Sequence, residues 1–121
     1  MSRPPLTLGV EEEFMIVDAQ TRALSSSVAE MLSQGREMLG DQIKAEFMQS
    51  QIEVGTHVCK DVQEVRAELT RLRRAVNDVA SLHGKRIAAA ATHPFSRVHE
   101  QDITDAERYH DLYSDLQYVA R

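Results

Sequence analysis

The stretch that decides the fold is Leu6-Thr7-Leu8-Gly9-Val10-Glu11-Glu12-Glu13-Phe14-Met15-Ile16-Val17, where three consecutive carboxylates interrupt an apolar run. Apolar residues around the acids, followed by turn-forming residues from Asp18 onward, predict a β-strand over residues 5–17. Side chains alternate between the faces of a strand, so Glu11 and Glu13 share one face and Glu12 takes the other. Like charges on one face repel, and a bound divalent cation commonly offsets that cost. The alternative is an edge strand whose acids are solvated.

Three capping-box patterns predict helix starts further along the chain. They are Ser27 with Glu30, Asp61 with Glu64, and Thr104 with Glu107. The longest helix follows Asp61 and ends before Gly84, with an apolar stripe spaced by three and four residues. The stripe comprises Val62, Val65, Leu69, Leu72, Val76, Val79 and Leu82. Short strands are expected at 23–25 and 86–92, although the alanines of the latter also suit a helix.

Residues 43–56 read as extended and carry Glu46 and Glu53, seven positions apart. In one straight strand these two carboxylates would face opposite sides of the sheet. If both belong to one site, a bulge or bend must fall between them, near Gln49-Ser50. The order strand, helix, hairpin-like strands, helix, strand, helix predicts an α+β fold for a single domain, 1–121. Its mainly antiparallel sheet would have helices on one face and an open face forming the site.

An open sheet face lined by acids suits a hard cation. The candidate ligands are Glu11, Glu13 and Glu53, with Glu46 conditional on the bend. Oxygen ligands favour Mg²⁺, Mn²⁺ or Ca²⁺ over zinc, and ligands from separate strands favour Mg²⁺ shared with a phosphate group. The sequence has no glycine-rich phosphate loop, so the phosphates of a nucleotide would be held through metal ions. Glu12, on the face under the helices, is expected to pair with an arginine or with backbone N–H groups.

Net charge, cysteine content and the length of apolar runs exclude some classes of function. The net charge of −5 argues against nucleic acid as a partner, because phosphate binding needs a basic face. Cys59 is the only cysteine, which is compatible with a reducing cytoplasm and predicts an inert thiol rather than a nucleophile. Residues 1–10 lack the apolar core of a secretory signal, and no apolar run reaches the roughly 18 residues that span a membrane. A cytoplasmic protein without a membrane partner is expected.

Four ordered blocks resemble the opening third of the type 2 glutamate–cysteine ligases, also described as carboxylate–amine ligases. The blocks are Leu8 to Phe14, Glu46 to Thr56, Thr92-His93-Pro94-Phe95 and Arg108-Tyr109. The resemblance implies a partial glutamine synthetase-like fold, in which a curved antiparallel sheet holds ATP, Mg²⁺ or Mn²⁺ and an amino acid. It also implies that ATP phosphorylates the γ-carboxylate of glutamate, and that the amine of cysteine or another acceptor attacks the acyl phosphate.

By motif match, Glu11, Glu13 and Glu53 fall on metal-ligand positions of that family, and Glu46 falls where related ligases have an acidic ligand. Thr56 and His93 lie in family motifs and are expected on the substrate side. From spacing alone, a hydrogen-bonded structural role for His93 remains the alternative. The match does not identify the acceptor amine, and a homo-oligomer is left open.

The chain differs from the members of this family in length. Family members are longer, and the helical pattern from Asp111 to Arg121 has no stop signal. The chain is therefore expected to be the N-terminal portion of a larger ligase catalytic domain, inactive or nearly so alone. Two alternatives stay open: a non-catalytic fragment or metal-binding domain that keeps the fold, and a different metal-dependent phosphoryl enzyme on an unrelated sheet.

Overall fold

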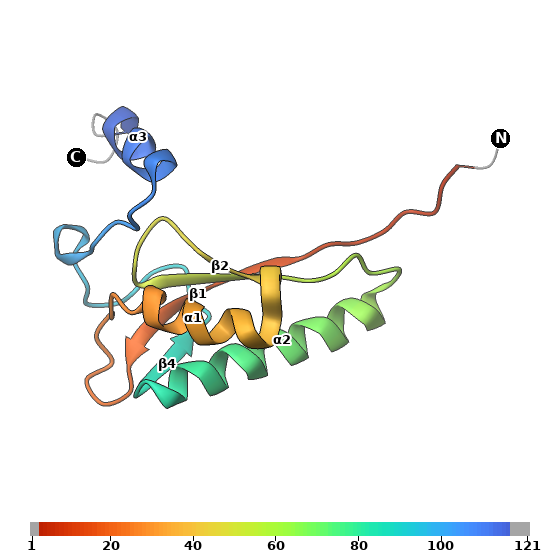
Figure 1. Cartoon of the computed structure of the whole chain (residues 1–121), viewed down its shortest axis with the longest axis horizontal. Helices are drawn as coiled ribbons and strands as arrows, with labels where there is room; N and C mark the ends of the chain where they lie inside the picture. The colour runs from red at the N-terminus through yellow and green to blue at the C-terminus, as the bar shows by residue number, and fades with distance from the viewer. Residues whose placement is uncertain (1–2, 117–121) are drawn as a thin grey trace.

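The computed structural model describes residues 3–116, which form one sheet with two helices packed against it and a third helix standing apart (Figure 1). The strands are β1 (Glu11–Asp18), β2 (Ile43–Ala45), β3 (Gln51–Gly55) and β4 (Lys85–Ala88). The α-helices are α1 (Val28–Leu39), α2 (Val62–Leu82) and α3 (Glu107–Leu116). Two short 3-10 helices, η1 (Gly40–Gln42) and η2 (Val98–Glu100), join these elements.

The four strands lie in the order β2-β3-β1-β4, and every neighbouring pair is antiparallel. The long strand β1 is central: its first half pairs with β3 and its second half with β4. This arrangement confirms the predicted α+β class with an antiparallel, open sheet. The first strand begins at Glu11 rather than at residue 5, because the preceding segment makes only an isolated bridge between Leu8 and Cys59.

Burial explains which sheet face the helices cover. Phe14 and Ile16 on β1 join Ile43, Ile52 and Val54 in one buried core. The helices contribute Val28, Met31 and Leu39 from α1 and Leu72, Ala75, Val76, Val79 and Ala80 from α2. Figure 1 shows α1 and α2 side by side along the sheet. The core therefore lies between the sheet and these two helices, and the opposite face of β1 carries Glu11 and Glu13.

The hairpin-like strands predicted within the extended stretch 43–56 are confirmed as β2 and β3, and the predicted bulge or bend is a full reversal of the chain. The chain reverses, and β2 and β3 pair as a hairpin with Lys44 opposite Glu53. The turn closes where the N–H of Gln51 donates to the carbonyl of Met48 (3.0 Å), so the expected bend at Gln49-Ser50 falls at its centre. The reversal allows Glu46 and Glu53 to share one face of the sheet. Lys44 lies opposite Glu53, and Glu46, two positions after Lys44, is on the same face as Lys44.

The caps differ in how closely they follow the sequence patterns. Asp61 caps α2 by accepting a hydrogen bond from the N–H of Glu64 (2.9 Å), as predicted. Ser27 makes no such bond, since its hydroxyl pairs with that of Ser25 instead (2.7 Å). Thr104 does not cap α3 either, and the helix begins at Glu107. The hydroxyl of Thr104 instead donates to the carbonyl of Glu46.

Some expected elements are shorter than predicted. The strand expected over 86–92 is β4, which ends at Ala88, and the strand expected at 23–25 is reduced to a bridge between Val17 and Leu24. The apolar stripe of α2 is buried only in its middle: Val62 and Leu82 at the two ends are each 69% exposed. The buried residues of α2 run from Leu72 to Ala80, so the turns between these residues are the ones that pack against the core. Residues 117–121 of the predicted last helix lie outside the described residues.

Candidate functional site

Three carboxylates lie on the face of the sheet that α1 and α2 leave open. Glu11 and Glu13 project from β1 on the face opposite to Phe14. Glu53 on β3 is the direct cross-strand partner of Glu13. Such opposed side chains have Cβ atoms about 5 Å apart, and like charges there repel. Two of the predicted ligands are therefore brought together by strand register.

These residues surround one hollow, which we call the acidic cavity. Its volume is about 230 Å³, and its lining consists of Glu11, Glu12, Glu13, Glu46 and Glu53. Glu46 reaches it from the turn that follows β2, and its Oε1 accepts a hydrogen bond from the N–H of Phe47 (2.8 Å). All four predicted metal ligands thus line a single cavity, although they come from three separate segments.

The pKa values of carboxyl groups in the acidic cavity show that bringing these groups together is electrostatically unfavourable. Burial raises the pKa of Glu53 above its ordinary value, and a hydrogen bond with the Glu46 carboxyl and the charges of Glu11 and Glu46 raise it further. Burial followed by the charge of Glu46 raises the pKa of Glu13. Glu13 as a residue is still exposed, so this effect belongs to a carboxyl group at the wall of the cavity. Carboxylates that resist ionisation together are suited to binding a cation.

Little positive charge compensates the acidic cavity. Lys44 lies 3.8 Å from Glu53, lowers its pKa, and has 57% of its side chain exposed. Within residues 3–116, this is the only ion pair formed by Glu11, Glu13, Glu46 or Glu53. An exposed lysine at this distance offsets only a small part of the repulsion.

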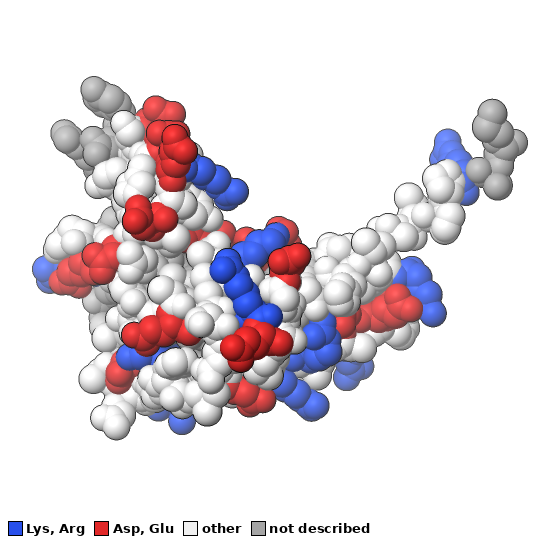
Figure 2. Space-filling view, in the orientation of Figure 1, with Lys and Arg blue, Asp and Glu red and all other residues white. Residues whose placement is uncertain are grey.

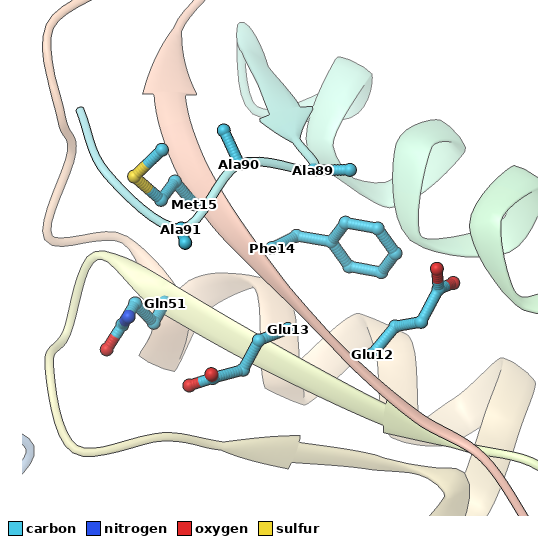
Figure 3. A pocket seen from close by; sticks show the side chains of 8 residues that line it. All are labelled: Glu12, Glu13, Phe14, Met15, Gln51, Ala89, Ala90 and Ala91. Carbon is cyan, nitrogen blue, oxygen red and sulfur yellow. The ribbon is translucent and has the colours of Figure 1, made fainter. Parts of the chain in front are cut away.

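Glu12 is neutralised on the other side of the strand. Arg73 of α2 binds it with both arms, through an Nε–Oε2 contact of 2.8 Å and a second contact from Nη2 to Oε1. Figure 3 shows Glu12 and Glu13 leaving opposite sides of β1, with Glu12 directed toward α2 and Glu13 directed over β3. The expected pairing of Glu12 with an arginine is confirmed. Over the face seen in Figure 2, acidic and basic side chains are interspersed.

The donor chemistry of the acidic cavity fits a hard divalent cation, because every charged donor is a carboxylate oxygen. The present side-chain placement does not yet form a ligand set. Among the described residues, no three carboxylate, imidazole or thiolate groups are arranged so that they could hold a metal ion. The residues fit in kind and in their shared cavity, but their carboxylates would have to turn toward one another around a cation.

The two predicted substrate-side residues lie outside the acidic cavity. Thr56 accepts a hydrogen bond at Oγ1 from the N–H of Val10 (3.1 Å) and lines a neighbouring hollow that also contains Glu11 and Lys44. His93 has its Nε2 2.8 Å from the carbonyl oxygen of Arg22, beside the open face. The hydrogen bond at His93 matches the structural alternative, and a substrate role for either residue remains a prediction.

A larger hollow of about 350 Å³ lies next to the acidic cavity along β1. Its walls are Glu12, Glu13, Phe14, Met15, Gln51, Ala89, Ala90 and Ala91. It exists because β4 ends at Ala88, and Figure 3 shows the alanines that follow passing over β1 near Met15. The small alanine side chains leave room that larger residues would fill. Glu12 and Glu13 line both hollows, so the two hollows are neighbours along β1.

Tyr109 is a residue near the site for which sequence reasoning found no role. It is 8% exposed, and its ring meets that of Phe47 edge to face, with centroids 5.7 Å apart. Burial raises the pKa of Tyr109 and the nearby charge of Glu46 raises it further, whereas Arg108 lowers it. No spacing signal links α3 to the turn after β2, so only the Arg108-Tyr109 motif match could have singled it out.

The fold and the cavity together define a class of protein, which has an α+β fold and an acidic site on the uncovered face of an antiparallel sheet. Residues 7–121 match the family described as glutamate-cysteine ligase family 2 (GCS2). The chain belongs to this family. Among the described residues, no helix is long and apolar enough to cross a membrane.

The chain is similar to relatives named "Putative glutamate--cysteine ligase 2" in several bacteria. Identity is 49% over 117 residues with the protein of Herpetosiphon aurantiacus, covering 97% of this chain. It is 51% over 117 residues with that of Sorangium cellulosum, covering 95%. The chain spans only about 30% of the length of these relatives.

Proposed function

We propose that this chain is the N-terminal portion of the catalytic domain of an ATP- and Mg²⁺-dependent carboxylate–amine ligase. The reaction joins glutamate to an amine such as cysteine through an acyl phosphate. The proposal extends the sheet to the curved, glutamine synthetase-like funnel that the resemblance implies. Family membership and the gathering of Glu11, Glu13, Glu46 and Glu53 around one cavity support it.

The chemistry requires a site of this kind. Bringing the glutamate carboxylate to ATP places two anions together, and divalent cations that bridge phosphate oxygens neutralise this repulsion and the charge of the transition state. In the proposal, Glu11, Glu13, Glu46 and Glu53 hold Mg²⁺ or Mn²⁺. The protein needs no nucleophile of its own, since the attacking groups belong to the substrates.

This chain's own residues have defined tasks in the proposal. The acidic cavity repels phosphate and carboxylate groups until cations are present, which makes substrate binding depend on the metal. Glu53 is central because it faces Glu13 across the strands and interacts with both Glu11 and Glu46. The hollow walled by the alanines offers space beside the carboxylates for a substrate, with Thr56 and His93 at neighbouring positions of the open face.

The test uses the complete ligase polypeptide that contains this chain. Glu11→Gln and Glu53→Gln each keep the side-chain shape and remove a charge, so both should abolish ADP release with glutamate, cysteine and Mg²⁺ while leaving the protein folded. Glu37→Gln on the exposed side of α1 is the matched control and should retain full turnover. Unchanged ADP release in both cavity variants would exclude these carboxylates from the reaction.

The second candidate is a cation-binding portion without catalysis. Carboxylate groups from three segments line one cavity, which supports cation binding and does not by itself require catalysis. This candidate predicts Mn²⁺ binding that Glu53→Gln weakens, with no ADP release from the complete polypeptide under any of these conditions.

A further inference from the structure

We propose that residues 102–109 form a positioning clamp for Glu46, in which Thr104 and Tyr109 are the positioning residues. The clamp holds the turn after β2 so that the Glu46 carboxylate stays in the acidic cavity. The inference rests on the proposed function, because it assigns these residues a part in building the cation site.

Glu46 needs such support more than the other three carboxylates do. Glu11 and Glu13 lie on β1 and Glu53 on β3, where ladder hydrogen bonds fix the backbone. β2 ends at Ala45, so Glu46 is the first residue outside the ladder. Backbone outside regular structure is the part of a fold that moves most readily. The local hydrogen bond from the N–H of Phe47 to the Glu46 carboxylate (2.8 Å) does not fix the backbone of the turn, so the position of Glu46 also depends on contacts from elsewhere.

The backbone of the clamp runs beside the turn. The N–H of Gln49 donates to the carbonyl of Asp102 (2.9 Å), and the N–H of Thr104 donates to the carbonyl of Phe47 (2.9 Å). Between these bonds, Met48 and Ile103 form an isolated antiparallel bridge. Segments more than fifty residues apart in sequence are thus paired like two short strands.

Side chains fix the backbone on both sides of Glu46. The Thr104 hydroxyl donates to the carbonyl of Glu46 itself, and the Tyr109 hydroxyl makes a longer bond to the carbonyl of Ala45 (3.4 Å). These two carbonyls belong to the peptide units before and after the Glu46 Cα, so the clamp restrains both. The edge-to-face contact between Tyr109 and Phe47 adds packing next to the same residue. Together these contacts set the direction in which the Glu46 side chain leaves the backbone.

The experiment measures Mn²⁺ binding to the full chain by the electron paramagnetic resonance signal of free Mn²⁺, together with the thermal midpoint. Thr104→Val replaces the hydroxyl with a methyl group of similar size, and Thr104→Ser keeps the hydroxyl. Tyr109→Phe is matched by Tyr113→Phe on the same helix, where the residue is 46% exposed. Thr104→Val and Tyr109→Phe should each weaken Mn²⁺ binding, Thr104→Val by about tenfold, as loss of a group supporting a ligand does. Thr104→Ser and Tyr113→Phe should bind as the parent does.

A double-mutant cycle separates positioning from general stability. In a Glu46→Gln background, Thr104→Val should cause no further loss of Mn²⁺ affinity, because the carboxylate that the clamp positions is gone. The clamp is overturned by parent-like affinity in Thr104→Val and Tyr109→Phe, or by an equal loss with and without Glu46. If Thr104→Val does not fold, Tyr109→Phe in the two backgrounds decides. If Glu53→Gln binds Mn²⁺ as tightly as the parent, the proposed function itself fails.

Discussion

At the scale of single residues, Glu53 is the point where the carboxylates of the open face interact most strongly. Its pKa is raised by burial, by its hydrogen bond with Glu46 and by the charges of Glu11 and Glu46. A carboxyl whose pKa is higher in the folded than in the unfolded chain adds stability only while it is protonated. That stability is complete below the ordinary value of 4.5 and is lost as the pH rises through the folded pKa.

Glu53→Gln should therefore raise the thermal midpoint of the chain at about pH 7, where the parent carries the repelling charge. At about pH 4 the parent is largely protonated, so the gain should shrink toward zero. Circular dichroism melts at the two pH values measure the difference, and Glu37→Gln on the exposed side of α1 provides the control. A gain that is larger at the acidic pH would contradict the described electrostatics.

The pair between Glu12 and Arg73 gives a residue-scale prediction with the opposite sign. Arg73→Gln should lower the thermal midpoint slightly, because it leaves the partly buried Glu12 carboxylate without its partner. Arg73 is more than half exposed, so the effect should nearly vanish at about 1 M NaCl, where screening is strong. Arg74→Gln is the control, since Arg74 forms no ion pair within residues 3–116. Equal sensitivity to salt in both variants would argue against the pair.

At the scale of elements, the contact between α1 and β2 depends on a missing side chain. Gly35 is buried in α1, and a Cβ placed there would lie 2.5 Å from Cδ1 of Ile43, which is itself 1% exposed. The glycine costs the helix about 1 kcal/mol relative to alanine. The close approach of α1 to β2 favours the glycine nevertheless, because a Cβ would force the buried Ile43 side chain to shift.

Gly35→Ala should thus destabilise the chain by about 1–3 kcal/mol, the usual cost of overpacking, despite its better helix propensity. Ile43→Val removes the clashing methyl group and should cost about 1 kcal/mol alone. Urea unfolding of the double variant should show less destabilisation than the sum of the two single variants. Strict additivity would indicate that α1 and β2 do not meet as described.

At the scale of the whole molecule, the acidic cavity is open on the side away from the helices. The chain spans about 30% of the length of its relatives, and the described residues supply carboxylates but no element that covers them. If the proposed function holds, we expect the complete polypeptide to release ADP with glutamate, cysteine and Mg²⁺ in a coupled assay and the 121-residue chain alone to release none. Turnover by the chain alone would show that the open face is already a complete site.

Local patterns predicted the parts of the fold that depend on neighbours in sequence. The alternation around Glu11, Glu12 and Glu13 gave the strand and the faces of its carboxylates, and the spacing of apolar residues gave α2. The capping box at Ser27 predicted the start of α1 correctly, but its side-chain hydrogen bond does not form because the Ser27 hydroxyl pairs with that of Ser25. That Glu46 and Glu53 share a cavity could be anticipated only from two sources. One is the alternation of side chains along a strand, which requires a bend between them, and the other is the family resemblance.

By itself, the sequence determined the α+β class, the main helices and strands and the opposite directions of Glu12 and Glu13, because helix and strand periods are local properties of the backbone. Only the tertiary structure decided the register in which β2 pairs with β3 and the placement of Glu46 beside Glu53. It also decided that residues 102–109 hold the turn carrying Glu46. These contacts join segments far apart in the chain, and their partners are selected by packing and hydrogen-bond satisfaction rather than by spacing.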